Sequence, residues 1–271
     1  MRRRRGFLER TTEHLLTITE HSLFAEEIAQ RDAFLQVQDP RVKVAGFLLL
    51  IVAAALSRSL AVIGALFAAA IVLAVVSQVP VGGLVRRAWA GVLVFTGLIA
   101  LPAICLTPGR PVARVFGLTV TAAGLRIAAL LVARAETTVT FALLLVLTTL
   151  WPHVLYALRS LRVPASLVAI LGMTYRYLFV LLRTARDMME ARRSREVGPM
   201  PPAMRRHVAT SSAGVLLGKT LHLADDVYLA MLSRGFRGDV RLLDPPRMRG
   251  RDWMVLLSFI AVAAAAVWSG R

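Results

Sequence analysis

Cysteine is almost absent from this sequence, which has a single one, Cys105, inside an apolar run. No disulfide and no cysteine-based metal site can be built from it within the chain. Lysine is nearly as rare, since only Lys43 and Lys219 accompany the arginines among 33 basic residues. Acidic residues number 16, which leaves a net charge of +17. Such a charge can indicate nucleic-acid binding. We expect no nucleic-acid partner, because long apolar blocks place this charge at an inner membrane surface instead.

The chain contains too many apolar residues for a soluble domain. Of its 271 residues, 57% are apolar, whereas soluble domains have roughly 45–50%. The surface of a globule needs polar cover, so lipid must solvate the excess apolar side chains. We therefore predict an integral membrane protein in contact with lipid, and we exclude a soluble enzyme.

Residues 1–38 form a polar N-terminal segment. Four arginines follow Met1, and apolar residues then recur at roughly helical spacing among charges that include Glu9 and Glu13. These charges prevent the segment from spanning a membrane, and the lack of an apolar core argues against a cleaved signal peptide. We expect a cytoplasmic amphipathic helix that lies near anionic lipid.

Five apolar stretches predict five membrane-spanning helices, four within residues 39–151 and the last within residues 252–271. Asp39 can cap the first of them, and Pro40 suits its first turn. The fourth carries Arg126, Arg134 and Glu136. Charges at membrane depth are expensive, so they serve either function or packing and snorkelling, and both interpretations stay open. The apolar runs are 44–56, 61–76, 91–106, about 122–150, and 253–268.

Residues 152–251 differ from the rest, because they hold 17 of the 33 basic residues against seven acidic ones. Such an excess is typical of a cytoplasmic segment, and it predicts an inside N-terminus and an outside C-terminus. Residues 165–182 are apolar enough to span, but the arginines that follow would then be exported. We therefore predict two long helices at the inner membrane face, about 164–195 and 209–234. The expected fold is an all-α membrane protein with about five spans plus these cytoplasmic helices.

Two apparent chemical motifs fail on inspection. The segment Gly214-Val215-Leu216-Leu217-Gly218-Lys219-Thr220 resembles a phosphate-binding loop, but it has three residues instead of four between its glycines, and no strand precedes it. The five histidines form no dense ligand cluster, and no Ser-His-Asp arrangement can be argued. We expect no catalytic site, no cofactor and no metal bound by this chain.

Two short arginine motifs lie near the predicted ends of the cytoplasmic helices, Ser194-Arg195-Glu196 and Ser233-Arg234-Gly235. The helix dipole favours cations at a helix C-terminus, and Gly235 can adopt the left-handed conformation of a cap. Small neighbours leave room for a protein surface, and a guanidinium can form a two-pronged contact with a partner carboxylate. From the residues alone, ordinary solvated arginines remain the favoured interpretation.

Five segments, in order, change that interpretation. They are Asp39-Pro40-Arg41-Val42-Lys43, Leu161-Arg162-Val163-Pro164, Met173-Thr174-Tyr175-Arg176-Tyr177, Ser194-Arg195-Glu196, and Ala230-Met231-Leu232-Ser233-Arg234-Gly235-Phe236-Arg237-Gly238. Over about residues 39–240 the chain resembles the transmembrane T component of an energy-coupling-factor (ECF) transporter of the cobalt/nickel type called CbiQ. Glu196 stands where glycine is common in that family, and serine replaces alanine before both arginines.

The resemblance implies that Arg195 and Arg234 dock into two ABC-type ATPase subunits. Motion would then pass through the membrane helices to a substrate-binding S component of the CbiM type, with a small accessory membrane subunit as a further partner. The chain would be a non-catalytic subunit of an ATP-driven cobalt or nickel importer in a bacterial inner membrane. Two alternatives remain. One is a T component of a vitamin (biotin-type) importer, and the other is a stand-alone channel or secondary transporter whose pathway Arg126, Arg134 and Glu136 would line.

Overall fold

The computed structural model describes residues 29, 33–79, 82, 89–107, 111–115, 118–195, 201–237, 248 and 250–270. Most of the predicted N-terminal segment, and Glu196, therefore lie outside the described residues. The chain divides into two compact units. One, here called the bundle unit, contains the described residues up to Leu161 together with those from 248 onward. The other, the α8–α9 unit, contains the described residues 162–237.

Local capping explains where the helices of the bundle unit begin. Asp39 accepts a hydrogen bond from the backbone N–H of Arg41 at 2.8 Å, and Pro40 occupies the first turn, as the sequence predicts. Thr121 caps a later helix by accepting from the N–H of Gly124 at 3.1 Å. The helices whose bounds the structure describes in this unit are α2 (Pro40–Leu56), α3 (Leu60–Val76), α5 (Ala90–Leu106), α6 (Ala122–Thr148), α7 (Trp151–Ser160) and α10 (Gly250–Ser269).

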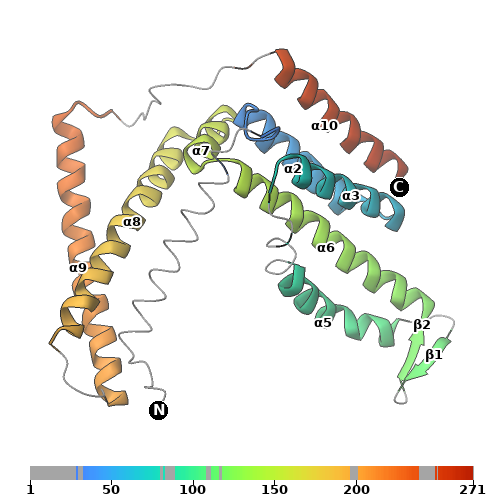
Figure 1. Cartoon of the computed structure of the whole chain (residues 1–271), viewed down its shortest axis with the longest axis horizontal. Helices are drawn as coiled ribbons and strands as arrows, with labels where there is room; N and C mark the ends of the chain where they lie inside the picture. The colour runs from blue at the N-terminus through green and yellow to red at the C-terminus, as the bar shows by residue number, and fades with distance from the viewer. Residues whose placement is uncertain are drawn as a thin grey trace. The chain divides into compact units, whose positions relative to one another are not determined.

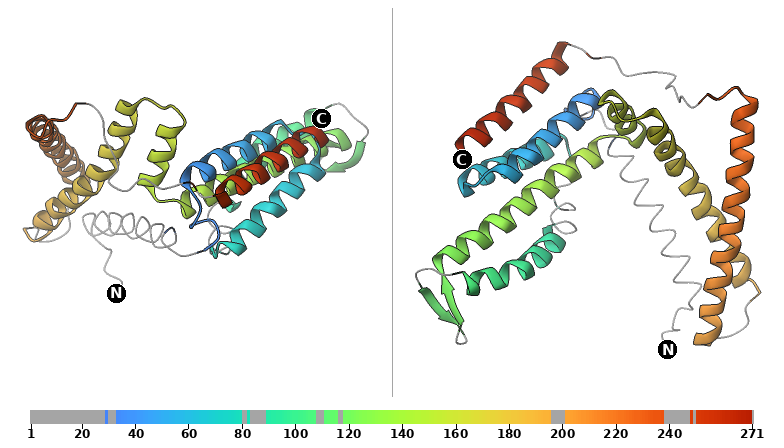
Figure 2. Two further views of the ribbon diagram at one scale, coloured as in Figure 1. Left: turned by 90° about the horizontal axis from the view of Figure 1, so that it is seen from above. Right: turned by 180° about the vertical axis from the view of Figure 1, so that it is seen from behind.

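Helix α6 lies at the centre of the bundle unit, where α2, α3 and α5 all pack against it (Figure 1). Helix α10, from the other end of the chain, runs alongside α2 (Figure 2). Three aromatic rings connect these layers, since the ring centroid of Phe47 lies 6.0 Å from that of Phe141 and 5.7 Å from that of Phe259. The core therefore joins α2, α6 and α10 directly.

A small hairpin departs from the predicted all-α fold. The connection between α5 and α6 forms β1 (Pro111–Val115) and β2 (Leu118–Thr121), which pair antiparallel with an irregular register near Pro111. Valine and threonine make up three of the four residues of β2 and two of the five of β1, and such β-branched residues favour the pleated conformation. The hairpin corrects the expectation from the sequence, which predicts only helices and connections and no strand in this region.

Two helices, α8 (Ala165–Arg193) and α9 (Pro202–Ser233), make up the second unit and run in opposite directions (Figure 1). Both long helices were predicted, but α9 begins seven residues before the expected start. Pro202 explains the difference, because proline is tolerated in the first turn of a helix. The same rule explains α7, which was not predicted, since Pro152 lies in the first turn of that helix.

Three of the described helices, α6, α8 and α10, are long and apolar enough to cross a membrane, and α3 and α5 are shorter apolar helices. Many large apolar side chains of the bundle unit are exposed, as lipid-facing residues would be; Val94 and Leu98 of α5 are 68% and 66% exposed. Length and composition alone would thus allow α8 to span. Its placement at the inner membrane face remains a prediction that depends on the distribution of charge.

Candidate functional site

The first arginine motif lies at the end of α8. Ser194 is the cap residue, and its hydroxyl donates a hydrogen bond to the carbonyl of Ala191 at 2.9 Å. The N–H of Arg195 donates to the carbonyl of Arg192 at 3.1 Å, while its side chain is exposed. The serine hydroxyl is thus used within the helix end. Of the two motif residues that the structure describes, Arg195 is therefore the one whose side chain can reach a partner.

The second motif closes α9 with a Schellman turn. Gly235 has a φ of +77°, which confirms the predicted left-handed cap. Its N–H donates to the carbonyl of Leu232 at 2.9 Å, and the N–H of Phe236 donates to that of Met231 at 3.0 Å. Arg234 is the cap residue between them and is exposed. Local backbone chemistry therefore fixes the point at which this arginine leaves the helix.

The whole of α9 separates the two motifs along the chain. With 32 residues, this helix is about 48 Å long. The connection from Arg195 to Pro202 has seven residue steps, which cover at most about 25 Å. One compact contact cannot include both arginines, so their arrangement suits two separate docking sites.

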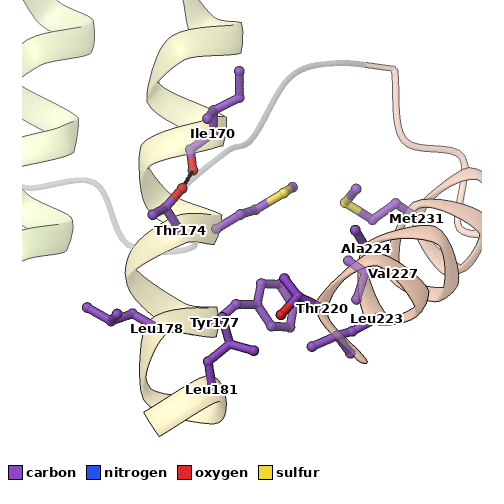
Figure 3. Close-up of a pocket in the computed structure, with 11 residues that line it drawn as sticks. Ile170, Thr174, Tyr177, Leu178, Leu181, Thr220, Leu223, Ala224, Val227 and Met231 are labelled. Carbon is purple, nitrogen blue, oxygen red and sulfur yellow. Dashed lines mark hydrogen bonds between the residues drawn. The ribbon is translucent and has the colours of Figure 1, made fainter. Parts of the chain in front are cut away.

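An apolar groove of about 400 Å³ lies between α8 and α9 (Figure 3). Side chains of both helices face it, including Met173, Thr174 and Tyr177 from one of the segments that carry the family resemblance. The hydroxyl of Thr174 donates to the carbonyl of Ile170 at 2.8 Å, so it presents no free donor to the groove. The groove therefore suits an apolar surface and not a polar ligand.

The α8–α9 unit covers little of its own apolar surface. Only Ala169 and Met189 of α8, and Val208 and Ser212 of α9, are buried among the described residues of these helices. Large apolar side chains are left open, and Leu217 is 63% exposed. Exposed apolar surface on this scale marks an interaction surface. The described apolar surface of this unit is therefore a candidate interface with another subunit or with lipid.

The near-match to a phosphate-binding loop is part of a helix. Residues 214–220 lie in the middle of α9, where no strand precedes them and no loop can cradle a phosphate. Lys219 is exposed on that helix. The geometry agrees with the dismissal of this motif from its glycine spacing.

Two basic residues inside the bundle bind helix ends instead of lining a pathway. Arg134 of α6 donates from Nη2 to the carbonyl of Ser57, the residue that caps α2, at 2.8 Å. Lys43 of α2 donates from Nζ to the carbonyl of Thr148, the last residue of α6, at 3.0 Å. Each helix thus supplies the cation for the C-terminal end of the other, where unpaired carbonyls and the helix dipole favour positive charge.

The other intramembrane charges are not joined to Arg134. Arg126 is exposed near the start of α6. Glu136 is only 7% exposed, and neither carboxylate oxygen has a hydrogen-bond partner in the part of the chain that the structure describes. Arg134 and Glu136 are two residues apart and therefore face different sides of α6. The three residues named for a stand-alone transport pathway are not brought together.

The segment that opens the membrane region contacts α7 and α10. The guanidinium of Arg41 lies over the ring of Tyr156, with Cζ 4.6 Å from its centroid, and Nη2 donates to the tyrosine hydroxyl. The N–H of Asp39 donates to Oδ1 of Asp252 at 3.4 Å. Burial lowers the pKa of His153 on α7, and the nearby charge of Lys43 lowers it further, while that of Asp39 opposes the shift. The sequence analysis singled out Asp39, Pro40 and Arg41, but it did not predict that Tyr156 and Asp252 contact this segment.

Within the described ranges, no group of three histidine, cysteine, aspartate or glutamate side chains is placed to hold a metal ion. His14 and His21, and the side chain of Cys105, lie outside those ranges. The described site chemistry therefore consists of exposed guanidiniums, an apolar groove and buried helix-end contacts.

Comparison with known proteins places these features in a family. Residues 32–243 match the family described as cobalt transport protein, CbiQ. The chain is 30% identical over 268 residues to an uncharacterised protein of Methanocaldococcus jannaschii, an alignment that covers 97% of this chain and 92% of that protein. It is 34% identical over 164 residues to the cobalt transport protein CbiQ of Rhodobacter capsulatus, which covers 58% of this chain and 63% of the relative. The range matched to the family contains both arginine motifs and the start of α2.

Proposed function

This chain belongs to the CbiQ family of cobalt transport proteins, the T components of ECF transporters, and we propose that it couples ATP hydrolysis to metal uptake. It is a multi-pass, non-catalytic membrane subunit. In the proposal, two ABC-type ATPase subunits dock on Arg195 and Arg234, and the membrane helices transmit their motion to an S component of the CbiM type. A small accessory membrane subunit completes the complex.

The observation that carries the proposal is the pair of exposed arginines, each at the C-terminal end of a long helix and separated by all of α9. Two fixed, well-separated cations suit two copies of one acidic docking groove. The uncovered apolar surface of α8 and α9 supports a role within a complex. Both features fit a coupling subunit better than an isolated transporter.

The proposed substrate is cobalt or nickel, which the S component would capture. The family description and the name of the Rhodobacter relative support cobalt. A vitamin importer of the biotin type is the alternative within the same architecture. The proposed location is a bacterial inner membrane, with the cytoplasmic segment at residues 152–251 and the spans α2, α3, α5, α6 and α10.

Reconstitution tests the coupling role directly. We expect liposomes that contain this chain together with the ATPase and S subunits to take up Co²⁺ or Ni²⁺ only when ATP is present on the ATPase side. Liposomes with this chain alone should take up neither ion, because Arg126, Arg134 and Glu136 form no joint site in the bundle. ATP-independent uptake by the single chain would favour the stand-alone transporter, and uptake of biotin in place of metal would favour the vitamin importer.

Cysteine labelling tests the topology, in a variant whose native Cys105 is replaced by alanine. A cysteine at Arg205, in the first turn of α9, should resist a membrane-impermeant thiol reagent added to intact cells. The matched control is a cysteine at Arg58, an exposed position in the turn between α2 and α3, which should react from outside. If α8 spans the membrane, as its length and composition allow, the Arg205 position will be labelled instead.

A further inference from the structure

The α8–α9 unit is an insertion in the bundle unit. Along the described residues, the chain leaves the bundle after α7 and enters it again at α10. Helix α2 packs against both α7 and α10. A displacement of the inserted unit that enters the bundle through α7 or α10 therefore acts on a helix that packs against α2.

The contact with α7 is specific to an arginine and a tyrosine. The guanidinium of Arg41 both stacks on the ring of Tyr156 and donates a hydrogen bond to its hydroxyl. A planar guanidinium can make both contacts at once, which a lysine ammonium cannot. Only residues 161–164 connect α7 to α8, and Arg162 among them has a left-handed φ of +67°. A connection this short leaves little slack between the two helices.

The contacts with α10 and α6 are made by neighbouring residues on the same helix end. Asp39 reaches Asp252 in the first turn of α10, and Lys43 reaches the carbonyl of Thr148 at the end of α6. Asp39, Lys43 and Asp252 are 4%, 2% and 4% exposed. Hydrogen bonds have a narrow range of good distances and angles, and a buried polar group that loses its partner is costly. These contacts therefore fix the N-terminal end of α2 at a defined position against α10 and α6.

We propose that Asp39, Arg41, Lys43, Thr148, Tyr156 and Asp252, here called the α2 joint, form the positioning element through which movement of the α8–α9 unit enters the membrane bundle. The proposal rests on the proposed function, because it assigns a step between ATP hydrolysis and metal uptake. With the joint loosened, the ATPases still dock and hydrolyse ATP. The displacement of α8 is then absorbed by movement of α7 against α2, and the bundle does not follow it.

The experiment measures metal ions taken up per ATP hydrolysed, in liposomes that contain the complete transporter. Arg41→Ala and Tyr156→Ala should each lower this ratio at least tenfold while the complex still assembles and hydrolyses ATP. The double variant should be no worse than either single variant, since residues that act as one unit are not additive. Tyr156→Phe keeps the ring but loses the hydroxyl, and its ratio should lie between those of the parent and Tyr156→Ala. Arg58→Ala, an exposed arginine beyond the other end of α2, should match the parent.

The outcomes separate this inference from the proposed function. If the parent chain needs no ATPase for uptake, the proposed function is wrong. If uptake by the parent depends on ATP hydrolysis but Arg41→Ala and Tyr156→Ala keep the parent ratio of ions to ATP, the α2 joint does not transmit the movement and the inference is wrong. Equal losses of hydrolysis and uptake would mean that the contact serves folding only, and would also overturn the inference. Should the alanine variants fail to assemble, a folded Tyr156→Phe complex with the parent ratio would have the same consequence.

Discussion

Replacing Arg195 and Arg234 together with alanine should abolish ATP-driven metal uptake and separate the ATPase from the membrane subunit. Each guanidinium is proposed to meet a carboxylate in a groove of one ATPase subunit. Removing one partner of a buried, hydrogen-bonded charge pair costs about 2–5 kcal/mol, because the other charge is left stranded. That range corresponds to a loss of affinity of more than about tenfold at each site. Co-purification of the ATPase and uptake in liposomes measure both effects.

The controls for this experiment come from α9, the helix that ends at Arg234. Arg206→Ala and Lys219→Ala remove exposed cations of α9 that lie away from its C-terminal cap, and they should assemble and transport like the parent. Arg195→Lys and Arg234→Lys should be harmful despite the retained charge, since lysine lacks the planar fork. If the double alanine variant transports like the parent, both arginines are ordinary surface charges and the docking proposal is wrong.

Gly46→Leu should strongly destabilise the bundle. A Cβ atom at Gly46 would lie 2.8 Å from Cγ of Phe259, so any side chain there collides with a buried ring of α10. Overpacking of this kind costs typically about 1–3 kcal/mol, and a leucine adds further atoms in the same direction. The expected result is a large drop in the thermal unfolding temperature of the purified protein in detergent, with poor recovery.

Gly64→Leu provides the matched control for that substitution. Gly64 lies in the interior of the apolar helix α3 and is exposed, and a Cβ atom added there would have no neighbouring atom within 4 Å. Leucine has a higher helix propensity than glycine, so this variant should be as stable as the parent or slightly more so. Equal thermal stability of the two leucine variants would show that α2 and α10 do not pack as closely as the structure has them.

Features that depend on neighbouring residues could be predicted from the sequence. The start of α2 at Asp39 and Pro40 and the left-handed cap at Gly235 follow from rules that act over a few positions. The same rules could have found α7, because Pro152 suits the start of a helix as well as the end of one. The hairpin was missed because a few β-branched residues between apolar helices give only a weak signal.

The positions of Arg195 and Arg234 at helix ends could be predicted from the sequence, whereas the contacts of the α2 end could not. Arg195 and Arg234 follow from helix ends and from the family resemblance. The partners of α2 could not be found, because Tyr156 and Asp252 are 115 and 213 positions away from the residues they bind. Nothing in the local sequence of a tyrosine or an aspartate identifies such a distant partner. Arg134 illustrates the same limit, since its contact with Ser57 is visible only in the folded bundle.

Because α2 packs against α10, the packing of α2 cannot be completed until the end of the chain has been synthesised. Phe259 emerges from the ribosome more than 200 residues after Gly46. At about 5–20 residues per second, the two are synthesised roughly 10–40 s apart. During that interval α2 has no α10 against which Gly46 can pack, and α8 and α9 are synthesised before α10. A nascent chain stalled before α10 would therefore expose the Gly46 face of α2 to membrane-protein quality control, although both arginine motifs would already have been made.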